Sequence, residues 1–151
     1  MVEFAKNGTG TMDETANVKR IAMWSGPQNI STALMRSWGN RSDCYVSDAP
    51  LYAYYLQQTG ADDLGRDETL AAHDADWRRV VGWLTGCVPR GRAIWYQKHL
   101  AHHMLPEVGR AWMSEMTHAF LIRDPGELLL ALRKSTPGIE IGDTGLPQQV
   151  A

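Results

Sequence analysis

The chain has 151 residues, of which 44% are hydrophobic and 21% charged, and this composition is typical of one soluble globular domain. The net charge of −2 gives no general attraction to nucleic acid or to an anionic membrane, so we expect neither as a partner. There is no run of 18 apolar residues and no charged-then-apolar amino terminus, which predicts no membrane span, no secretory signal and a cytoplasmic location.

The first part of the chain predicts a polar tail followed by a strand, a loop and a helix. Residues 1–17 are polar without sustained periodicity and predict a mobile tail. The apolar run at 21–24 predicts a strand, turn formers occupy 25–29, and helical spacing runs from about 30 to 38. A loop that enters a helix leaves backbone N–H groups unpaired, and the helix dipole adds positive charge there. We therefore expect this loop to bind an anion.

Strands and helices continue to alternate through the middle of the chain. The pattern predicts a strand at 44–47, a helix at 51–58, a surface loop at 61–68, a helix at 73–84 and a break at 87–92. Tyr52, Tyr54 and Tyr55 fit two roles, because aromatic side chains on a helix either pack in the core or line a pocket for an acceptor molecule.

The second half of the chain completes the pattern. It predicts a strand at 93–97, a helix that starts near Pro106, a strand at 117–122, a helix at 127–134 and an irregular tail at 135–151. The two strands deliver Lys98, His99 and Arg123 to their carboxyl ends, where open α/β sheets bind ligands. Alternating strands and helices predict one α/β domain at 18–134, with a parallel sheet between two layers of helices.

The loop at 25–29 lacks the parts of an ATP or GTP hydrolase. Such a loop reads GxxxxGKS or GxxxxGKT, in which the lysine meets the terminal phosphates and the hydroxyl holds magnesium. Here PQNIST follows Gly26, with neither the second glycine nor the lysine, so magnesium-dependent phosphoryl transfer is not expected.

No recognised metal-binding spacing is present in the sequence. Cys44 and Cys87 belong to no such spacing, and we expect two reduced thiols. His99 and His103 lie four residues apart, but no acidic or thiol partner at a recognised spacing supports a zinc site. We therefore predict no metal.

Four blocks of the sequence resemble the bacterial sulfotransferase-like P-loop proteins, and they occur in the family's order. The blocks read SGPQNISTALMRS, SDAPLYAYYL, IWYQKHLAHHMLP and FLIRDP. Related chains are sometimes labelled branched-chain aminotransferase-like, although nothing in this sequence resembles an aminotransferase lysine site. The resemblance implies a nucleotide-binding fold of the P-loop type. It also implies transfer of a sulfuryl group from 3′-phosphoadenosine 5′-phosphosulfate (PAPS) to a hydroxyl or amine of a small molecule, without a metal.

The resemblance also assigns roles to individual residues. Arg123 matches the arginine that contacts the 3′-phosphate, although a salt bridge with Asp124 or another surface carboxylate is an alternative role for it. His99, next to Lys98, lies where such enzymes often place the base that takes the acceptor's proton, although His99, His102 and His103 could equally pack in the core or lie exposed. The residues that correspond to the loop around the 5′-phosphosulfate are Pro27, Gln28, Asn29, Ile30, Ser31 and Thr32.

Several positions depart from the family pattern. Gln28 stands where a basic residue is common, Ala49 where relatives carry a glutamate, and Ala131 where a serine is usual. The sequence also ends at Ala151, whereas family members run further. Three interpretations therefore remain open: an active sulfotransferase; a shortened, inactive relative that binds a nucleotide or phosphate or acts as an interaction module; and a partial chain that completes its sheet through a partner or as a homodimer.

Overall fold

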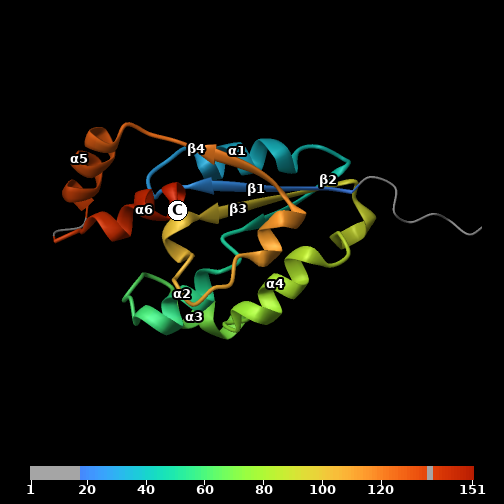
Figure 1. Ribbon diagram of the computed structural model, residues 1–151, viewed down its shortest axis with the longest axis horizontal. Helices are drawn as coiled ribbons and strands as arrows, with labels where there is room; N and C mark the ends of the chain where they lie inside the picture. The colour runs from blue at the N-terminus through green and yellow to red at the C-terminus, as the bar shows by residue number, and fades with distance from the viewer. Residues whose placement is uncertain (1–17, 136–137) are drawn as a thin grey trace, which may run out of the picture.

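The computed structural model describes residues 18–135 and 138–151, so the tail predicted at 1–17 lies outside the described residues. In this part of the chain, four strands form one sheet in the order β2-β3-β1-β4. The strands are β1 (Lys19–Ser25), β2 (Cys44–Asp48), β3 (Ile94–Leu100) and β4 (Thr117–Leu121). All neighbouring strands run parallel (Figure 1). The prediction of a parallel α/β sheet is confirmed.

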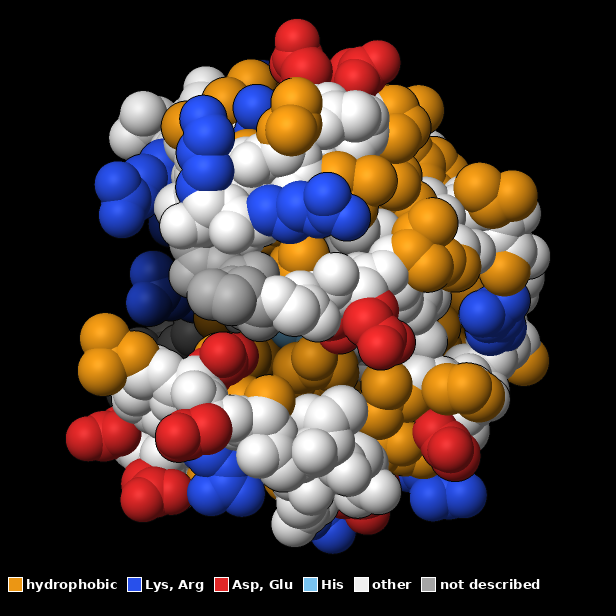
Figure 2. All heavy atoms as spheres, turned by 90° about the vertical axis from the view of Figure 1, so that its left-hand side faces the viewer, with side chains coloured by type: hydrophobic (Ala, Val, Ile, Leu, Met, Phe, Trp, Pro, Cys, Tyr) orange, Lys and Arg blue, Asp and Glu red, His pale blue; other side chains and the backbone are white. Residues whose placement is uncertain are grey.

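Helices cover both faces of the sheet. The first helix, α1 (Ser31–Gly39), lies on one face, and α2 (Tyr52–Thr59), α3 (Arg66–Ala72) and α4 (Trp77–Thr85) lie on the other side (Figure 1). Two more helices, α5 (Pro125–Ser135) and α6 (Leu146–Val150), lie beyond the carboxyl ends of the strands, on the side that faces the viewer in Figure 2. The connecting 3₁₀ helices are η1 (Pro89–Gly91), η2 (Ala101–His103), η3 (Ala111–Glu115) and η4 (Ile141–Thr144). No helix of the described residues combines the length and apolarity needed to cross a membrane.

The strand β3 contributes to a hydrophobic core on each face of the sheet, because successive side chains of a strand point to opposite faces. Trp95 packs in the larger cluster with Trp24 of β1 and Leu84 of α4. Tyr96 belongs to the cluster beneath α1, where its ring stacks on Trp38 with 5.2 Å between ring centroids. Neighbouring residues of β3 therefore pack in the hydrophobic cores on opposite faces of the sheet.

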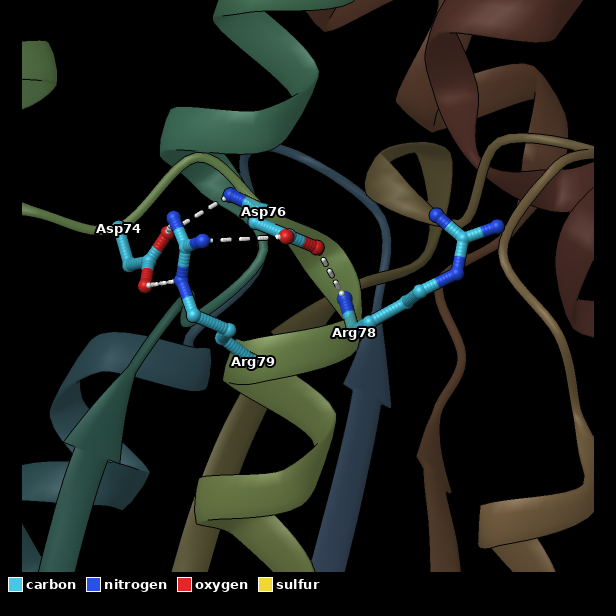
Figure 3. A network of polar contacts seen from close by, with 4 residues as sticks. All are labelled: Asp74, Asp76, Arg78 and Arg79. Carbon is cyan, nitrogen blue, oxygen red and sulfur yellow. Dashed lines mark hydrogen bonds and ion pairs between the residues drawn. The ribbon is translucent and has the colours of Figure 1, made fainter.

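The helix α4 begins later than the sequence pattern predicts, because two aspartates fix its start. The side chain of Asp76 caps the helix by accepting the Arg78 backbone N–H at 2.9 Å. Asp74 accepts the Asp76 backbone N–H at 2.8 Å and binds the Arg79 guanidinium at 2.6 and 2.8 Å (Figure 3). The Arg78 side chain points away from both carboxylates (Figure 3). The residues before Asp76 are consequently held in a turn rather than in the helix.

Three other predictions about local structure need correction. The loop predicted at 61–68 gives way to α3 at Arg66, where two acidic residues in the first turn favour a helix amino terminus. No helix starts at Pro106, because the backbone N–H of Val108 bonds to the carbonyl of Leu105 in a local turn. The segment predicted as an irregular tail forms η4 and α6, and Thr144 within it is fully buried.

Candidate functional site

The loop at 26–30 joins β1 to α1 at the carboxyl end of an interior strand. Gln28 has a backbone φ of 52°, in the left-handed region, which allows the tight turn between strand and helix. Ile30 is the N-cap residue of α1, and no side chain caps the helix there. Without such a cap, the first backbone N–H groups of α1 have no side-chain partner there, an arrangement in which helix amino termini bind anions. Anion binding by this loop stays a prediction.

Arg123 lies against this loop. Its Nη1 donates a hydrogen bond to the backbone carbonyl of Gln28 at 3.0 Å, and its Nε lies 3.9 Å from a carboxylate oxygen of Glu127. Asn29 makes a second connection, because its Nδ2 donates to the Leu121 carbonyl at 3.4 Å. The structure therefore brings the predicted arginine and the predicted loop together, although they come from opposite parts of the sequence.

The other predicted loop residues differ in their surroundings. Pro27 lines the cavity that opens beside this loop. Ser31 is buried at the start of α1, whereas the side chains of Ile30 and Thr32 are exposed. Of the two predicted hydroxyl residues, Thr32 is therefore the exposed one and Ser31 is buried.

A cavity of about 860 Å³ opens beside the loop, at the carboxyl ends of β1, β2 and β3. It lies on the side of the molecule shown in Figure 2, where the surface is hollowed between an upper and a lower part. The aspartate, lysine and histidine side chains that line it are Asp48, Asp63, Asp143, Lys98, His73, His102 and His103. Across the described residues, no group of three or more His, Cys, Asp or Glu side chains is arranged to hold a metal ion.

Lys98 reaches this cavity from β3. Its Nζ lies 2.6 Å from the Asp48 carboxylate, and the two residues are paired across β2 and β3. The Lys98 side chain is only 9% exposed, whereas that of Asp48 is 46% exposed. The carboxylate therefore compensates a lysine charge that is largely removed from water.

His99, the next residue of β3, points to the other face and does not line the cavity. It is 1% exposed, its ring stacks on Trp24 at 4.4 Å, and its Nε2 lies 3.2 Å from the side-chain oxygen of Gln97. Burial, with a smaller contribution from His118, lowers the pKa of His99 to about 3. His99 consequently does not meet the geometric requirement for a base that acts on a molecule in the cavity.

Four aromatic side chains form one wall of the cavity. The His103 ring stacks on Tyr52 and Tyr55, with centroid distances of 5.1 and 4.7 Å, and the Tyr55 ring meets His102 edge-on at 5.2 Å. Tyr54 packs in the core instead. Tyr52 and Tyr55 therefore line the cavity, and a role for them in binding an acceptor stays a prediction. The sequence signal for the histidines was their place directly after β3, at the edge of the sheet where ligands bind.

The carboxyl-terminal segment forms another wall. Ile139 and Asp143 line the cavity. The carbonyl oxygen of Thr144 lies only 2.6 Å from the position that a Cβ on Gly26 would occupy, so only glycine fits there without a shift. The end of the described chain therefore packs directly on the loop after β1.

Comparison with known families identifies this architecture. The family model described as Sulfotransferase domain matches residues 19–151, nearly the whole chain. The chain belongs to the sulfotransferase family. The family assignment agrees with the resemblance seen in the sequence and with the parallel α/β sheet.

Two curated plant proteins are similar to this sulfotransferase-family chain. Branched-chain-amino-acid aminotransferase-like protein 2 of Arabidopsis thaliana is 36% identical over 117 residues, and these cover 78% of this chain and 21% of the relative. Branched-chain-amino-acid aminotransferase-like protein 1 of the same plant is 35% identical over 120 residues, with the same coverage. The chain thus spans about a fifth of the length of the curated relatives that it matches. No solved structure gives a significant match.

Proposed function

We propose that this chain binds PAPS and transfers its sulfuryl group to a hydroxyl or amine of a small molecule. The observation that carries the proposal is the contact between Arg123 and the loop carbonyl of Gln28. It puts a guanidinium beside the uncapped amino terminus of α1, and both groups bind phosphate and sulfonate oxygens well. Membership in the sulfotransferase family supports the same chemistry.

The loop and its neighbours would hold the donor. PAPS supplies the sulfuryl group and a phosphate leaving group. The backbone N–H groups at the start of α1 would bind the 5′ end and stabilise the charge that develops on the phosphate oxygen as its bond to sulfur breaks. Arg123 would bind the 3′-phosphate through two N–H groups. Lys98, which lines the cavity together with Pro27, would donate a hydrogen bond to an oxygen of the transferred group while it stays paired with Asp48.

The acceptor would occupy the cavity. Its oxygen or nitrogen forms the new bond to sulfur, and its proton must pass to a group in the cavity wall. His102 and His103 line the cavity, and burial lowers the pKa of both imidazoles. A neutral imidazole can accept a proton, and these two residues line the cavity whereas His99 does not.

A second candidate function is nucleotide binding without transfer. Gln28 provides no cation in the loop, and Ala49 lines the cavity with a methyl group where relatives carry a carboxylate. Ala131 of α5 likewise offers no hydrogen-bond donor to a phosphate. Each change removes a group that could stabilise or position the reacting atoms, while the backbone anion site remains.

Calorimetric titration with adenosine 3′,5′-bisphosphate, using AMP as the control in a metal-free buffer, tests the proposal. The bisphosphate is the product that leaves after transfer, so we expect it to bind at least about ten-fold more tightly than AMP. Equal binding of the two nucleotides, or no binding by a folded chain, would contradict the proposal. Formation of the bisphosphate from PAPS in the presence of an acceptor would then separate transfer from binding alone.

A further inference from the structure

Two of the carboxylates that line the cavity have no lysine or arginine partner within the described part of the chain. Asp63 lies between α2 and α3, and Asp143 lies in η4. The Tyr52 hydroxyl donates to Asp63 at 2.9 Å, and the Glu140 backbone N–H donates to Asp143 at 2.9 Å. Among the described residues, neither carboxylate forms an ion pair with a lysine or arginine.

The two carboxylates act on the same part of the cavity. Burial is the largest cause of the raised pKa of the Tyr55 hydroxyl, and the negative charges of Asp143 and Asp63 raise this pKa further. The lysine of the cavity does not balance them, because Lys98 is paired with Asp48 at 2.6 Å. Figure 2 shows acidic side chains gathered at the lower left of this side of the molecule, below the hollow. An anionic acceptor would be repelled here, whereas a cation would be attracted.

His103 gives an independent sign that a ligand is missing from this cavity. It lines the cavity, is 2% exposed, and its Nδ1 has no hydrogen-bond partner among the described residues. Burial, with smaller effects of His102, His99 and Lys98, holds the pKa of His103 well below its usual value. A buried polar group without a partner is costly, and a ligand hydroxyl would provide one.

We propose that the acceptor carries a protonated amine in addition to its hydroxyl group, with the ammonium bound by Asp63 and Asp143 and the hydroxyl bound by His103. This inference rests on the proposed function, because it names the acceptor class of the same site. The rings of Tyr52 and Tyr55 add apolar and aromatic surface beside the carboxylates, which favours an organic cation over a small inorganic one.

Three phenols of similar size and different charge test the charge preference. Tyramine is cationic, 4-ethylphenol is neutral and 4-hydroxyphenylacetate is anionic, so they differ mainly at the end away from the hydroxyl. In calorimetric titrations of the full chain at neutral pH, we expect tyramine to bind at least about ten-fold more tightly than either analogue. The preference should weaken as salt is added. Equal or tighter binding of the neutral or anionic phenol overturns the inference, as does a lack of tyramine binding.

Substitutions that remove only charge assign the effect to the two carboxylates. In Asp63→Asn with Asp143→Asn, the amide oxygens can still accept the bonds from Tyr52 and Glu140, so the fold should persist, which circular dichroism can verify. We expect the preference for tyramine over 4-ethylphenol to disappear. The matched control is Asp67→Asn, which removes an exposed carboxylate that does not line the cavity and should leave the preference within about two-fold. A preference that survives the double substitution contradicts the inference.

His103 is tested with phenethylamine, which lacks the hydroxyl of tyramine. The wild-type chain should bind tyramine more tightly than phenethylamine, and His103→Phe should abolish this difference while keeping an aromatic ring against Tyr52 and Tyr55. Titration of the same samples with adenosine 3′,5′-bisphosphate separates the two proposals. If the bisphosphate binds but the amines show no preference, the acceptor inference fails and the proposed function stands. If the bisphosphate does not bind while tyramine is still preferred, the cavity binds amines but takes no part in sulfuryl transfer.

Discussion

Arg123 and Gln28 are 95 residues apart in the sequence, yet the guanidinium of the first bonds to the backbone carbonyl of the second at 3.0 Å. The contact exists because β1 and β4 are parallel neighbours whose carboxyl ends lie at the same edge of the sheet. It places the guanidinium that follows β4 beside the amino terminus of α1, which follows β1. The predictions about the donor site depend on this contact.

Arg123→Ala should weaken binding of adenosine 3′,5′-bisphosphate by about ten-fold or more, because charge-assisted hydrogen bonds to phosphate are the strong ones. Binding of AMP should change by less than about three-fold, since AMP has no 3′-phosphate. Calorimetry with both nucleotides measures this difference. Arg133→Ala, at an exposed arginine of α5, is the matched control. An equal loss for both nucleotides would show that Arg123 acts on the loop rather than on the 3′-phosphate.

Gln28→Arg should strengthen binding of the same bisphosphate by about three- to ten-fold at low salt, because it adds a cation to the loop while the backbone bond to Arg123 stays. The gain should shrink with added salt, as expected for partly exposed charges. Gln57→Arg adds the same charge on the exposed face of α2, outside the main cavity, and serves as the control. A similar gain in both variants would mean that net charge, not the loop, is responsible.

Gly26→Ala should destabilise the fold by about 1–3 kcal/mol, because its new methyl group would lie 2.6 Å from the Thr144 carbonyl oxygen, a backbone atom. Gly82→Ala should instead stabilise the fold by roughly 0.5–1 kcal/mol, because Gly82 lies within α4 and a Cβ there meets nothing within 4 Å. Urea denaturation of both variants compares them directly. An unchanged free energy of unfolding in Gly26→Ala would mean that the carboxyl-terminal segment does not pack on the loop.

The Lys98–Asp48 pair should respond unequally to the loss of either partner. Asp48→Asn leaves the lysine charge, 9% exposed, without its carboxylate and should cost about 1–3 kcal/mol. Lys98→Met leaves an aspartate that is 46% exposed and therefore hydrated, so it should cost less than about 1 kcal/mol. The free energies of unfolding from urea titration give both values. The opposite order would contradict the assignment of Lys98 as the partner that depends on the pair.

The fold should lose stability as the pH falls below about 6.5. Burial lowers the pKa of His99 from 6.5 to about 3, so between these values the unfolded chain binds a proton that the folded chain does not. The free energy of unfolding should therefore fall by up to about 1.4 kcal/mol per pH unit from this residue. Urea titrations at several pH values between 5 and 8 measure the slope. His99→Gln should reduce the slope by the contribution of this one residue, because burial also lowers the pKa of His102 and His103. His73→Gln replaces an exposed histidine as the control.

The order of strands and helices could be predicted from the sequence because the signals for them are local. The apolar run of β1, the turn formers after it and the helical spacing of α1 all lie within a short stretch, and each has one dominant structural meaning. The start of α4 was also a local signal, since an aspartate before an apolar helix is a typical N-cap. Helical spacing alone, however, continues back to His73 and predicts an earlier start than the capped one.

The candidate site was harder to predict because it depends on distant contacts. Strand alternation predicts that the side chains of Lys98 and His99 lie on opposite faces of the sheet. The sequence alone does not say which of these faces carries the cavity. His103 and Asp143 meet in the cavity wall only after the carboxyl-terminal segment folds back toward β1. No periodicity in that glycine-containing, polar segment indicates such packing.

The strand order also bears on synthesis of the chain. Among the described strands, the interior strand β1 leaves the ribosome before the other three, but both of its neighbours come much later, since Ser25 and His99 are 74 residues apart. At about 5–20 residues per second, its apolar segment would wait several seconds for the first neighbour. During that interval the donor loop cannot be formed and the apolar strand has no partner in the sheet. The nascent chain is therefore expected to need protection until the second half of the domain emerges.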